Sequence, residues 1–268
     1  MPLLRLTPRI LIIAGSDSGG GAGVQADIKT VTVLGGYAAT AITAITVQNT
    51  LGVQAVHLVP PEVVEAQAQA VLGDIGADAI KTGMLGSAET MEAVARLLDR
   101  VPKIPAVIDP VMIATSGRPL LDDRGRERLC ALLAPRASLL TPNAPEAACL
   151  TGLKVETTDD LRRAGDALLE RGARAVLLKG GHIPGDRVID VLMTPAGETV
   201  FEGPRHDTRH THGTGCTLAS ACAVGLAEGL PVDRAVARAW AYVAEAIRHA
   251  PGLGAGRGPL AHGWPLPR

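Results

Sequence analysis

Two glycine-rich segments contain the residues whose types and spacing could do chemistry. The second segment, His212-Gly213-Thr214-Gly215-Cys216-Thr217, precedes a stretch of small residues, Leu218–Leu226, that predicts a helix. A Gly-x-Gly turn at a helix start directs successive backbone N–H groups at one point, and the helix dipole adds positive potential there. Gly213 and Gly215 are therefore predicted to form an anion hole suited to a phosphoryl group in transfer.

Cys216 lies at or close to the first residue of that predicted helix. A thiol in this place is expected to have a lowered pKa and to be partly ionised near neutral pH. Such a group can take a proton from an alcohol. The alternative is a small buried hydrophobic residue, which is the commoner role of a free cysteine and our interpretation of Cys130, Cys149 and Cys222. Its place after Gly-Thr-Gly favours a catalytic role for Cys216.

The first glycine segment runs from Gly15 to Gly23, where glycines let the backbone turn sharply and approach a ligand closely. Its spacing matches a dinucleotide-binding pattern, which requires an acidic residue about 20 positions further on. No Asp or Glu occurs between Ile28 and Pro61, and no Gly-Lys-Ser/Thr is present. A dehydrogenase and a Walker A loop are thus excluded. Asp27 either presents a carboxylate to a small polar molecule or belongs to the first turn of a helix, favoured by its dipole.

Polar residues also follow three apolar runs that predict strands. Asn143 and Glu146 are one helical turn apart on one face, and their oxygens suit Mg²⁺ bound together with phosphates. The same two residues also fit the N-cap and first turn of a helix. The metal-binding and helix-start interpretations are compatible. Asp109 ends another run at the same end of the sheet and is a further candidate for the metal. Lys179 follows Val176–Leu178, where it could contact a nucleotide phosphate.

The elements that position these residues alternate along the chain. Short apolar runs predict strands covered on both faces. These runs are Ile10–Ala14, Ala38–Val47, Ala79–Lys81, Ala106–Ile108, Ser138–Leu140 and Ala175–Leu178. Helical patterns lie between them, with Ser87 as an N-cap and Thr158-Asp159-Asp160 as a start signal. This alternation predicts an α/β fold, a three-layer α/β/α sandwich around a mainly parallel sheet.

Three further segments have predicted conformations outside that alternation. Val188–Phe201 predicts a hairpin near a sheet edge. The tail Gly252–Arg268 is expected to be irregular. Ala114–Arg118 is either a lid over the substrate or an ordinary surface loop. No linker or repeat is visible, so we expect one domain over residues 1–268.

Composition narrows the class of protein further. The 268 residues are 47% hydrophobic, which suffices for a large core, and the net charge is −1, which gives no electrostatic case for nucleic acid or an anionic membrane. The run Ile10–Ala14 is far shorter than the roughly 20 residues that a membrane span needs. Four cysteines without a C-x-x-C pair indicate a reducing compartment. We therefore expect a cytoplasmic protein with a small-molecule substrate.

Six segments in this order resemble the bacterial hydroxymethylpyrimidine/phosphomethylpyrimidine kinase family. They are Gly15–Asp27, Thr46–Thr50, Lys81–Leu85, Asp109–Met112, Thr141–Glu146 and His212–Thr217. The resemblance implies a ribokinase-like fold and two ATP-dependent, Mg²⁺-assisted steps. The hydroxymethyl oxygen of the thiamine precursor is phosphorylated first, and that phosphate is then phosphorylated to the pyrophosphate. It also implies a homodimer.

The resemblance also assigns roles to single residues. It implies that Gln48 hydrogen-bonds the edge of the aminopyrimidine, because an amide offers both a donor and an acceptor. It implies a substrate pocket that includes Gly15, Ala22, Asp27 and Met84. It implies that Cys216 is the general base. We expect Cys216 to matter more in the first step, because the nucleophile of the second step is a phosphate oxygen that is already anionic. Nucleotide-side roles are implied for Asn143, Glu146, Lys179, Thr211 and Gly213.

Two other functions compete with this interpretation. The first is a pyridoxal or pyridoxine kinase of the same superfamily. Gln48 disfavours this alternative because its amide suits an aminopyrimidine. The second is a non-catalytic domain that senses the pyrimidine. Such a domain could lose Cys216 or the Asn143–Glu146 pair, and this chain keeps both.

Overall fold

The apolar runs form one sheet in the computed structural model, which describes residues 7–112 and 123–266. The order of its strands is β3-β2-β1-β4-β5-β6-β7-β8-β9. Neighbours from β2 to β7 are parallel, whereas β3, β8 and β9 pair antiparallel. The strands are β1 (Arg9–Asp17), β2 (Tyr37–Asn49), β3 (Gly52–Leu58), β4 (Ala79–Thr82), β5 (Ala106–Ile108), β6 (Leu139–Leu140), β7 (Val176–Leu178), β8 (Arg187–Thr194) and β9 (Gly197–Pro204). The predicted mainly parallel sheet is confirmed.

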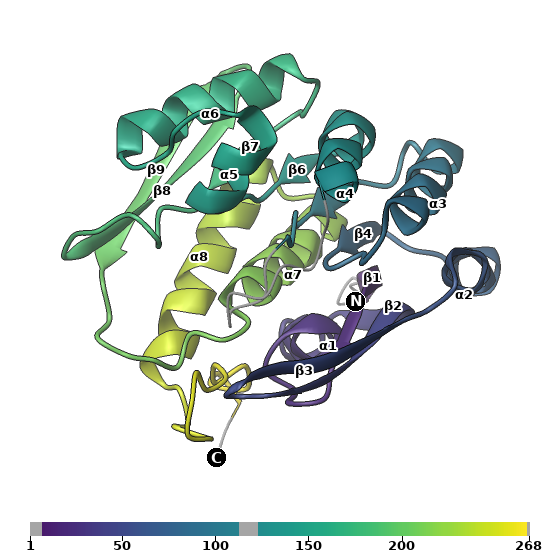
Figure 1. Cartoon of the computed structure of the whole chain (residues 1–268), viewed down its shortest axis with the longest axis horizontal. Coiled ribbons are helices and arrows are strands. Elements are labelled where there is room, and N and C mark those ends of the chain that lie inside the picture. The colour runs from purple at the N-terminus through teal and green to yellow at the C-terminus, as the bar shows by residue number, and fades with distance from the viewer. Residues whose placement is uncertain (1–6, 113–122, 267–268) are drawn as a thin grey trace, which may run out of the picture.

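Helices cover both faces of this sheet, which makes three layers (Figure 1). Helices α2, α3, α5 and α6 pack on one face, and α1, α7 and α8 pack on the other. The helices are α1 (Gly23–Val33), α2 (Pro61–Asp74), α3 (Ala88–Arg100), α4 (Asp123–Arg128), the short turns η1 (Leu129–Leu133) and η2 (Ala134–Arg136), α5 (Ala144–Thr151), α6 (Thr158–Glu170), α7 (Thr214–Ala227) and α8 (Val232–Arg248). Together they confirm the α/β/α sandwich.

Strand β1 shows why its sequence is apolar throughout. Ile10 and Ile12 point into the core beneath α1, α7 and α8, while Leu11 and Ile13 point into the opposite core. Side chains alternate between the faces of a strand, so a strand covered by helices on both sides needs apolar residues at every position.

Most predicted boundaries agree with the structure. Ser87 caps α3 by accepting a hydrogen bond from the Thr90 N–H, and Val188–Phe201 falls within the edge hairpin β8–β9. The sequence did not predict strand β3, because it is half exposed and lacks the continuous apolar run of the central strands. The predicted lid, Ala114–Arg118, lies outside the described residues. Within the described ranges, no helix is long and apolar enough to cross a bilayer.

The C-terminal tail after α8 is irregular, as predicted, and is anchored by specific contacts. The Arg257 N–H donates to the Thr50 carbonyl at the β2–β3 turn, and His212 forms a β-bridge with Pro259. The ring of His262 is buried, and its Nε2 lies 3.1 Å from Thr217 Oγ1 in the first turn of α7. Since the Thr217 hydroxyl already donates to the Gly213 carbonyl, His262 Nε2 is the donor to Thr217. The tail thus supports the start of α7.

We expect this contact to make stability depend on pH. Burial, with the charges of Lys29 and His212, lowers the pKa of His262 to about 4. The folded state therefore favours the neutral ring. The contribution of neutral His262 to stability is complete above pH 6.5 and is lost as the pH falls toward 4. Between these values the wild type should lose about 3 kcal/mol more unfolding free energy than His262→Gln, which keeps a donor but does not titrate. Urea unfolding of both proteins at pH 4.5 and pH 7.5 measures this difference, and equal pH dependence would contradict it.

Candidate active site

The predicted site residues meet at the carboxyl ends of the parallel strands. The first glycine segment begins at the end of β1, Asp109 follows β5, Asn143 follows β6 and Lys179 follows β7. Helix α7 begins at the same edge, within the second glycine segment, at Thr214. In open α/β sheets ligands bind at this edge, so the topology alone brings these segments together.

The first glycine segment is folded around the carboxylate of Asp17. Its Oδ1 accepts the Gly19 N–H at 2.8 Å, and its Oδ2 accepts the N–H groups of Gly21 and Ala22 at 3.1 and 2.9 Å. Oδ2 also lies 2.8 Å from His212 Nε2. Burial alone would raise the pKa of Asp17, but the hydrogen bonds from His212 and the backbone outweigh it and lower the pKa. Asp17 is thus an ionised anchor that ties the two glycine segments to each other.

Glycine is required where the two segments touch. Gly213 has φ +88° and precedes α7, and a Cβ on it would collide with the Gly21 carbonyl oxygen. A Cβ on Gly215 would lie 3.2 Å from Lys179 Nζ and 3.4 Å from Asp109 Oδ2. The first N–H groups of a helix have no acceptor within it. The N–H groups at the start of α7 are therefore placed beside a buried charged cluster, as an anion hole requires.

That cluster contains the residues predicted for the nucleotide side. Lys179 Nζ lies 3.0 Å from Asp109 Oδ1 and 3.9 Å from Glu146 Oε2. The Thr141 hydroxyl donates to Asp109 Oδ1 at 3.0 Å. Burial, followed by the Asp109 charge, raises the pKa of Glu146 to about 7, although Lys179 opposes this. An added cation would relieve this crowding of two carboxylates.

Asn143 and Glu146 form the predicted helix cap at the start of α5. The Glu146 N–H donates to Asn143 Oδ1 at 2.9 Å, and the Asn143 N–H donates to Glu146 Oε2 at 2.7 Å. A reciprocal capping box of this kind satisfies two backbone donors at once. The cap also holds Glu146 against Lys179, so the structural role positions the predicted chemical one.

Cys216 is the third residue of α7, and its environment corrects one expectation. Burial, with the nearby Asp27 and Asp109 carboxylates, raises the pKa of its thiol to about 11, although Lys81 and the Gly23 N–H oppose this. The predicted lowered pKa is therefore wrong for the unliganded chain. Burial is the largest cause of the shift, and two acids lie nearby, so a position at a helix start does not suffice to lower this pKa.

Asp27 lies in the second turn of α1, which rules out the alternative that placed it in the first turn. It makes a buried ion pair with Lys81. Both its oxygens lie 2.8 Å from Lys81 Nζ, and the Ser220 hydroxyl donates to Oδ1 at 2.8 Å. Neither charged side chain has any exposed surface. Burial by itself lowers the pKa of Lys81, but the charge and hydrogen bonds of Asp27, together with the nearby Cys216 and Asp109, outweigh burial and raise that pKa. A direct contact between Asp27 and a substrate stays a prediction.

The other predicted substrate residues lie on the first glycine segment, on β2 and just after β4. The Cε atom of Met84 occupies the space that a Cβ on Gly15 would need. Ala22 precedes α1, and its N–H is one of the donors to Asp17. The half-buried Gln48 reaches His212 from β2, with its Nε2 placed 3.2 Å from the ring Nε2. Thr211, which was predicted for the nucleotide side, uses its carbonyl oxygen to accept a hydrogen bond from the Thr214 hydroxyl.

Comparison with known proteins agrees with this geometry. The family model described as phosphomethylpyrimidine kinase matches residues 17–261. The chain is 50% identical over 259 residues to hydroxymethylpyrimidine/phosphomethylpyrimidine kinase of Streptomyces coelicolor, covering 97% of this chain and 96% of that protein. The chain belongs to the phosphomethylpyrimidine kinase family. It is therefore a phosphotransferase, and the resemblance of its six segments is confirmed.

Two more relatives of this kinase are informative. It is 49% identical over 253 residues to the thiamine biosynthesis bifunctional protein ThiED of Geobacter sulfurreducens, covering 94% of this chain and 52% of that protein. Its fold matches a Bacillus subtilis pyridoxal kinase, solved as an ADP complex, with a TM-score of 0.91 and 34% identity, covering 98% of this chain and all of that one. The predicted ribokinase-like fold is confirmed.

Three ionisable residues of the kinase were assigned no role from the sequence. Asp17, Lys81 and His212 all lie within the matched segments. An ion pair of Lys81 could have been inferred from the sequence, because Lys81 ends an apolar run that predicts a strand buried on both faces. A lysine that is buried in this way needs a counter-charge. The contact between Asp17 and His212 could not have been inferred, since it joins positions that are far apart in the sequence.

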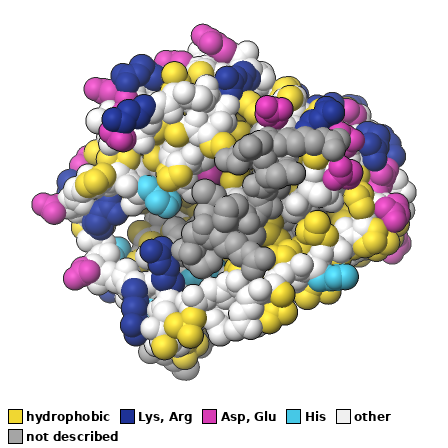
Figure 2. Space-filling view, in the orientation of Figure 1, with side chains coloured by type: hydrophobic (Ala, Val, Ile, Leu, Met, Phe, Trp, Pro, Cys, Tyr) yellow, Lys and Arg dark blue, Asp and Glu magenta, His cyan; other side chains and the backbone are white. Residues whose placement is uncertain are grey.

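On the face shown in Figure 2, basic side chains border a hollow in the surface. His182 follows the Lys179 turn, and burial together with the charges of Lys179, Arg257 and Arg205 lowers its pKa. Arg205 donates to the carbonyl oxygens of Gly181, Ile183 and Gly185, so it holds the loop that carries His182. Positive charge thus extends outward from Lys179.

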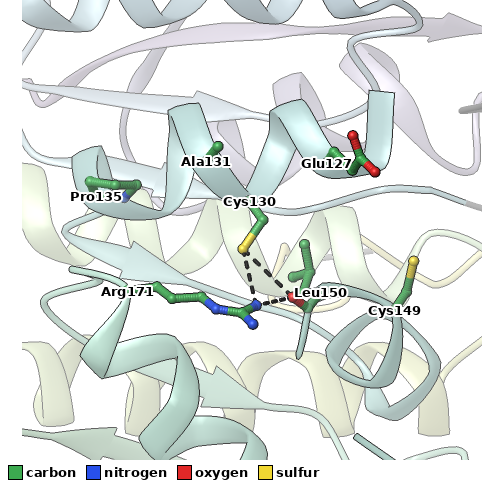
Figure 3. A pocket seen from close by; sticks show the side chains of 7 residues that line it. All are labelled: Glu127, Cys130, Ala131, Pro135, Cys149, Leu150 and Arg171. Carbon is green, nitrogen blue, oxygen red and sulfur yellow. Dashed lines mark hydrogen bonds between the residues drawn. The ribbon is translucent and has the colours of Figure 1, made fainter. Parts of the chain in front are cut away.

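A separate pocket of the kinase lies outside this site (Figure 3). It is lined by Glu127, Cys130, Ala131, Pro135, Cys149, Leu150 and Arg171. Arg171 Nη1 lies 3.4 Å from Cys130 Sγ and also donates to the Leu150 carbonyl. Cys222 is buried as predicted and Cys130 is half-buried, but Cys149 is exposed on α5, so its predicted burial is wrong.

Proposed function

We propose that this kinase transfers phosphoryl groups from ATP to 4-amino-5-hydroxymethyl-2-methylpyrimidine. The first transfer forms the monophosphate, and the second forms the pyrophosphate that enters thiamine biosynthesis. The names of its relatives and the family match over residues 17–261 support this assignment. We also propose that the chain acts in the cytoplasm as one domain.

One observation supports the assignment most strongly. The start of α7 brings Gly213, Gly215 and Cys216 between the first glycine segment and the Asp109–Lys179–Glu146 cluster. The residues predicted for the substrate therefore lie across the start of α7 from those predicted for the nucleotide. An in-line phosphoryl transfer needs this arrangement, because the attacking and leaving oxygens lie on opposite sides of the phosphorus.

The first step needs a proton acceptor, and the second does not. In the first step the hydroxymethyl oxygen forms a bond to the γ-phosphorus, the bond to ADP breaks, and the alcohol proton passes to the thiolate form of Cys216. In the second step the attacking phosphate oxygen is already anionic. The N–H groups at the start of α7 and the Lys179 ammonium stabilise the negative charge of the transferred group in both steps.

Mg²⁺ fits the donors on the nucleotide side. Asp109 and Glu146 offer hard oxygen ligands, and Mg²⁺ is commonly held by one or two carboxylates together with phosphates and water. No group of three or more His, Cys, Asp or Glu ligands occurs in the described part of the chain, so the protein alone makes no closed metal cage. The metal would neutralise phosphate charge, and Glu146 and Asp109 would hold it or its waters.

We expect Glu146→Gln to raise the KM for Mg-ATP about tenfold or more, because a charge-assisted contact is lost. The pyrimidine KM should change less than twofold. A glutamine oxygen can still accept the Asn143 N–H, so the cap survives and the melting temperature should hardly move. Initial rates at varied Mg-ATP measure the effect. An unchanged KM for Mg-ATP would remove Glu146 from the nucleotide site.

Pyridoxal is the competing substrate, because a pyridoxal kinase shares the fold. The two assignments are separated by measuring ADP release with the aminopyrimidine and with pyridoxal under the same conditions. We expect kcat/KM for the aminopyrimidine to exceed that for pyridoxal by at least tenfold. A higher value for pyridoxal would move the assignment to the competing function.

We further propose that the chain forms a homodimer. Ile45 and Val47 of β2 and Leu51 of the following turn are 52%, 52% and 72% exposed. Exposed apolar side chains this close together support a contact between copies. Light scattering coupled to gel filtration tests this, and a monomer at micromolar concentration would contradict it.

A further inference from the structure

We propose that His212 is a positioning residue that fixes which way the Gln48 amide faces, and thereby sets how the pyrimidine ring enters the site. The inference rests on the proposed function, since it concerns the predicted contact between Gln48 and the ring. His212 reaches both side chains with a single atom: its Nε2 lies 2.8 Å from Asp17 Oδ2 and 3.2 Å from the Gln48 amide.

The proton of His212 is located by its partner. Asp17 is nearly fully buried, and its Oδ2 accepts two backbone N–H groups besides facing the imidazole. An oxygen surrounded by donors is an ionised carboxylate oxygen, not a hydroxyl. Nε2 at 2.8 Å from it must therefore carry a hydrogen, because two lone pairs would repel each other at that distance.

This hydrogen decides the orientation of Gln48. An Nε2–H group cannot face an NH₂ group, so the amide atom nearest His212 must be the oxygen. The nitrogen and oxygen of an amide have nearly the same shape, and only the hydrogen-bond network distinguishes them. Turned this way, the NH₂ group faces Thr46 Oγ1 across 3.2 Å. Thr46 can accept there, because its own hydrogen is donated to the Ser16 carbonyl at 2.9 Å.

The network leaves Gln48 with two hydrogen-bonding positions in a fixed order. One lone pair of the oxygen remains on the His212 side, and one N–H remains on the Thr46 side. A 4-aminopyrimidine presents the complement, an amino donor beside a ring nitrogen acceptor. Its amino group would therefore lie toward His212. The hydroxymethyl group is on the adjacent ring carbon, so it would also lie on the His212 side, and His212 directly precedes Gly213 in the chain.

The same arrangement of the Gln48 amide, with its oxygen on the His212 side, disfavours pyridoxal. In pyridoxal the carbon next to the one that bears the hydroxymethyl group carries an aldehyde, which is only an acceptor. Its oxygen would face the Gln48 oxygen, and two acceptors repel each other. If the amide were free to turn, its NH₂ could donate to the aldehyde instead. His212 thus determines specificity through Gln48, although it need not touch the substrate.

The test compares His212→Phe and His212→Gln in wild-type and Gln48→Leu backgrounds. The measured quantity is the ratio of kcat/KM for the aminopyrimidine to that for pyridoxal. We expect His212→Phe, which has no N–H at this position, to lower the ratio about tenfold. His212→Gln, which can keep the donor, should retain it to within threefold. In the Gln48→Leu background, His212→Phe should change the ratio less than twofold.

An unchanged ratio in His212→Phe would overturn the proposal. An equal drop in both backgrounds would also overturn it, because His212 would then not act through Gln48. Neutron diffraction on the wild type gives a second test that needs no variant. It must show deuterium on His212 Nε2 and the Gln48 oxygen facing it, and the reverse orientation would contradict the inference. Failure of the proposed function is recognised separately, since the wild type would then not prefer the aminopyrimidine.

Discussion

Cys216→Ala should lower the rate of the first phosphoryl transfer by roughly 10²- to 10⁴-fold, the usual contribution of a general base. The second transfer should fall less than tenfold, because the nucleophile of that step is an anionic phosphate oxygen. The rates are measured separately, by supplying the hydroxymethylpyrimidine or its monophosphate with Mg-ATP. Equal losses in both steps would indicate that Cys216 shapes the anion hole and does not act as the base.

The raised pKa of Cys216 adds a pH dependence to this prediction. Because the pKa of the thiol is about 11 in the unliganded protein, few molecules carry a thiolate at neutral pH. The reactive fraction therefore increases with pH, and kcat/KM for the first step should rise by up to tenfold per pH unit between pH 7 and pH 9. Cys216→Ala should lose this rise. A wild-type profile that is flat over this range would contradict the role of the thiolate.

Lys81→Met should destabilise the protein by about 3–5 kcal/mol, because it leaves the Asp27 carboxylate charged and buried without a partner. Lys81 and Asp27 have no exposed surface, and Ser220 supplies only one neutral hydrogen bond to the pair. Urea unfolding measures the loss. Since the pair lies beneath Cys216 and the first glycine segment, activity should fall together with stability.

Two controls separate this effect from a general cost of substitution. Arg100→Met breaks an ion pair with Glu65 on the surface, where the arginine is 50% exposed, and should cost less than about 1 kcal/mol. The double variant Lys81→Met/Asp27→Leu removes both charges and should recover most of the stability lost in Lys81→Met. A double variant as unstable as Lys81→Met would show that packing, and not the unpaired charge, causes the loss.

The fold could be predicted from the sequence because its strands are buried on both faces. Continuous apolar runs such as Ile10–Ala14 mark such strands clearly, and polar residues at their carboxyl ends mark the site. Strand β3 is half exposed at the sheet edge, and its composition does not distinguish it from a loop.

The chemistry of single side chains was less predictable, since it depends on contacts between distant segments. The cap formed by Asn143 and Glu146 is local, and it was predicted. The pKa of Cys216 depends on burial and on Asp27 and Asp109, which lie far away in the sequence, and the prediction from its helix position alone was wrong. The pairing of Asp17 with His212 spans 195 positions and leaves no local signal.

A single active site is proposed to phosphorylate the aminopyrimidine twice. The most direct test incubates the wild-type kinase with limiting 4-amino-5-hydroxymethyl-2-methylpyrimidine and excess Mg-ATP, and follows ADP release and the phosphorus NMR spectrum of the products. We expect two ADP per pyrimidine, with the monophosphate appearing first and then giving way to the pyrophosphate. Release that stops at one ADP, with the monophosphate as final product, or no turnover of the pyrimidine at all, would contradict the account.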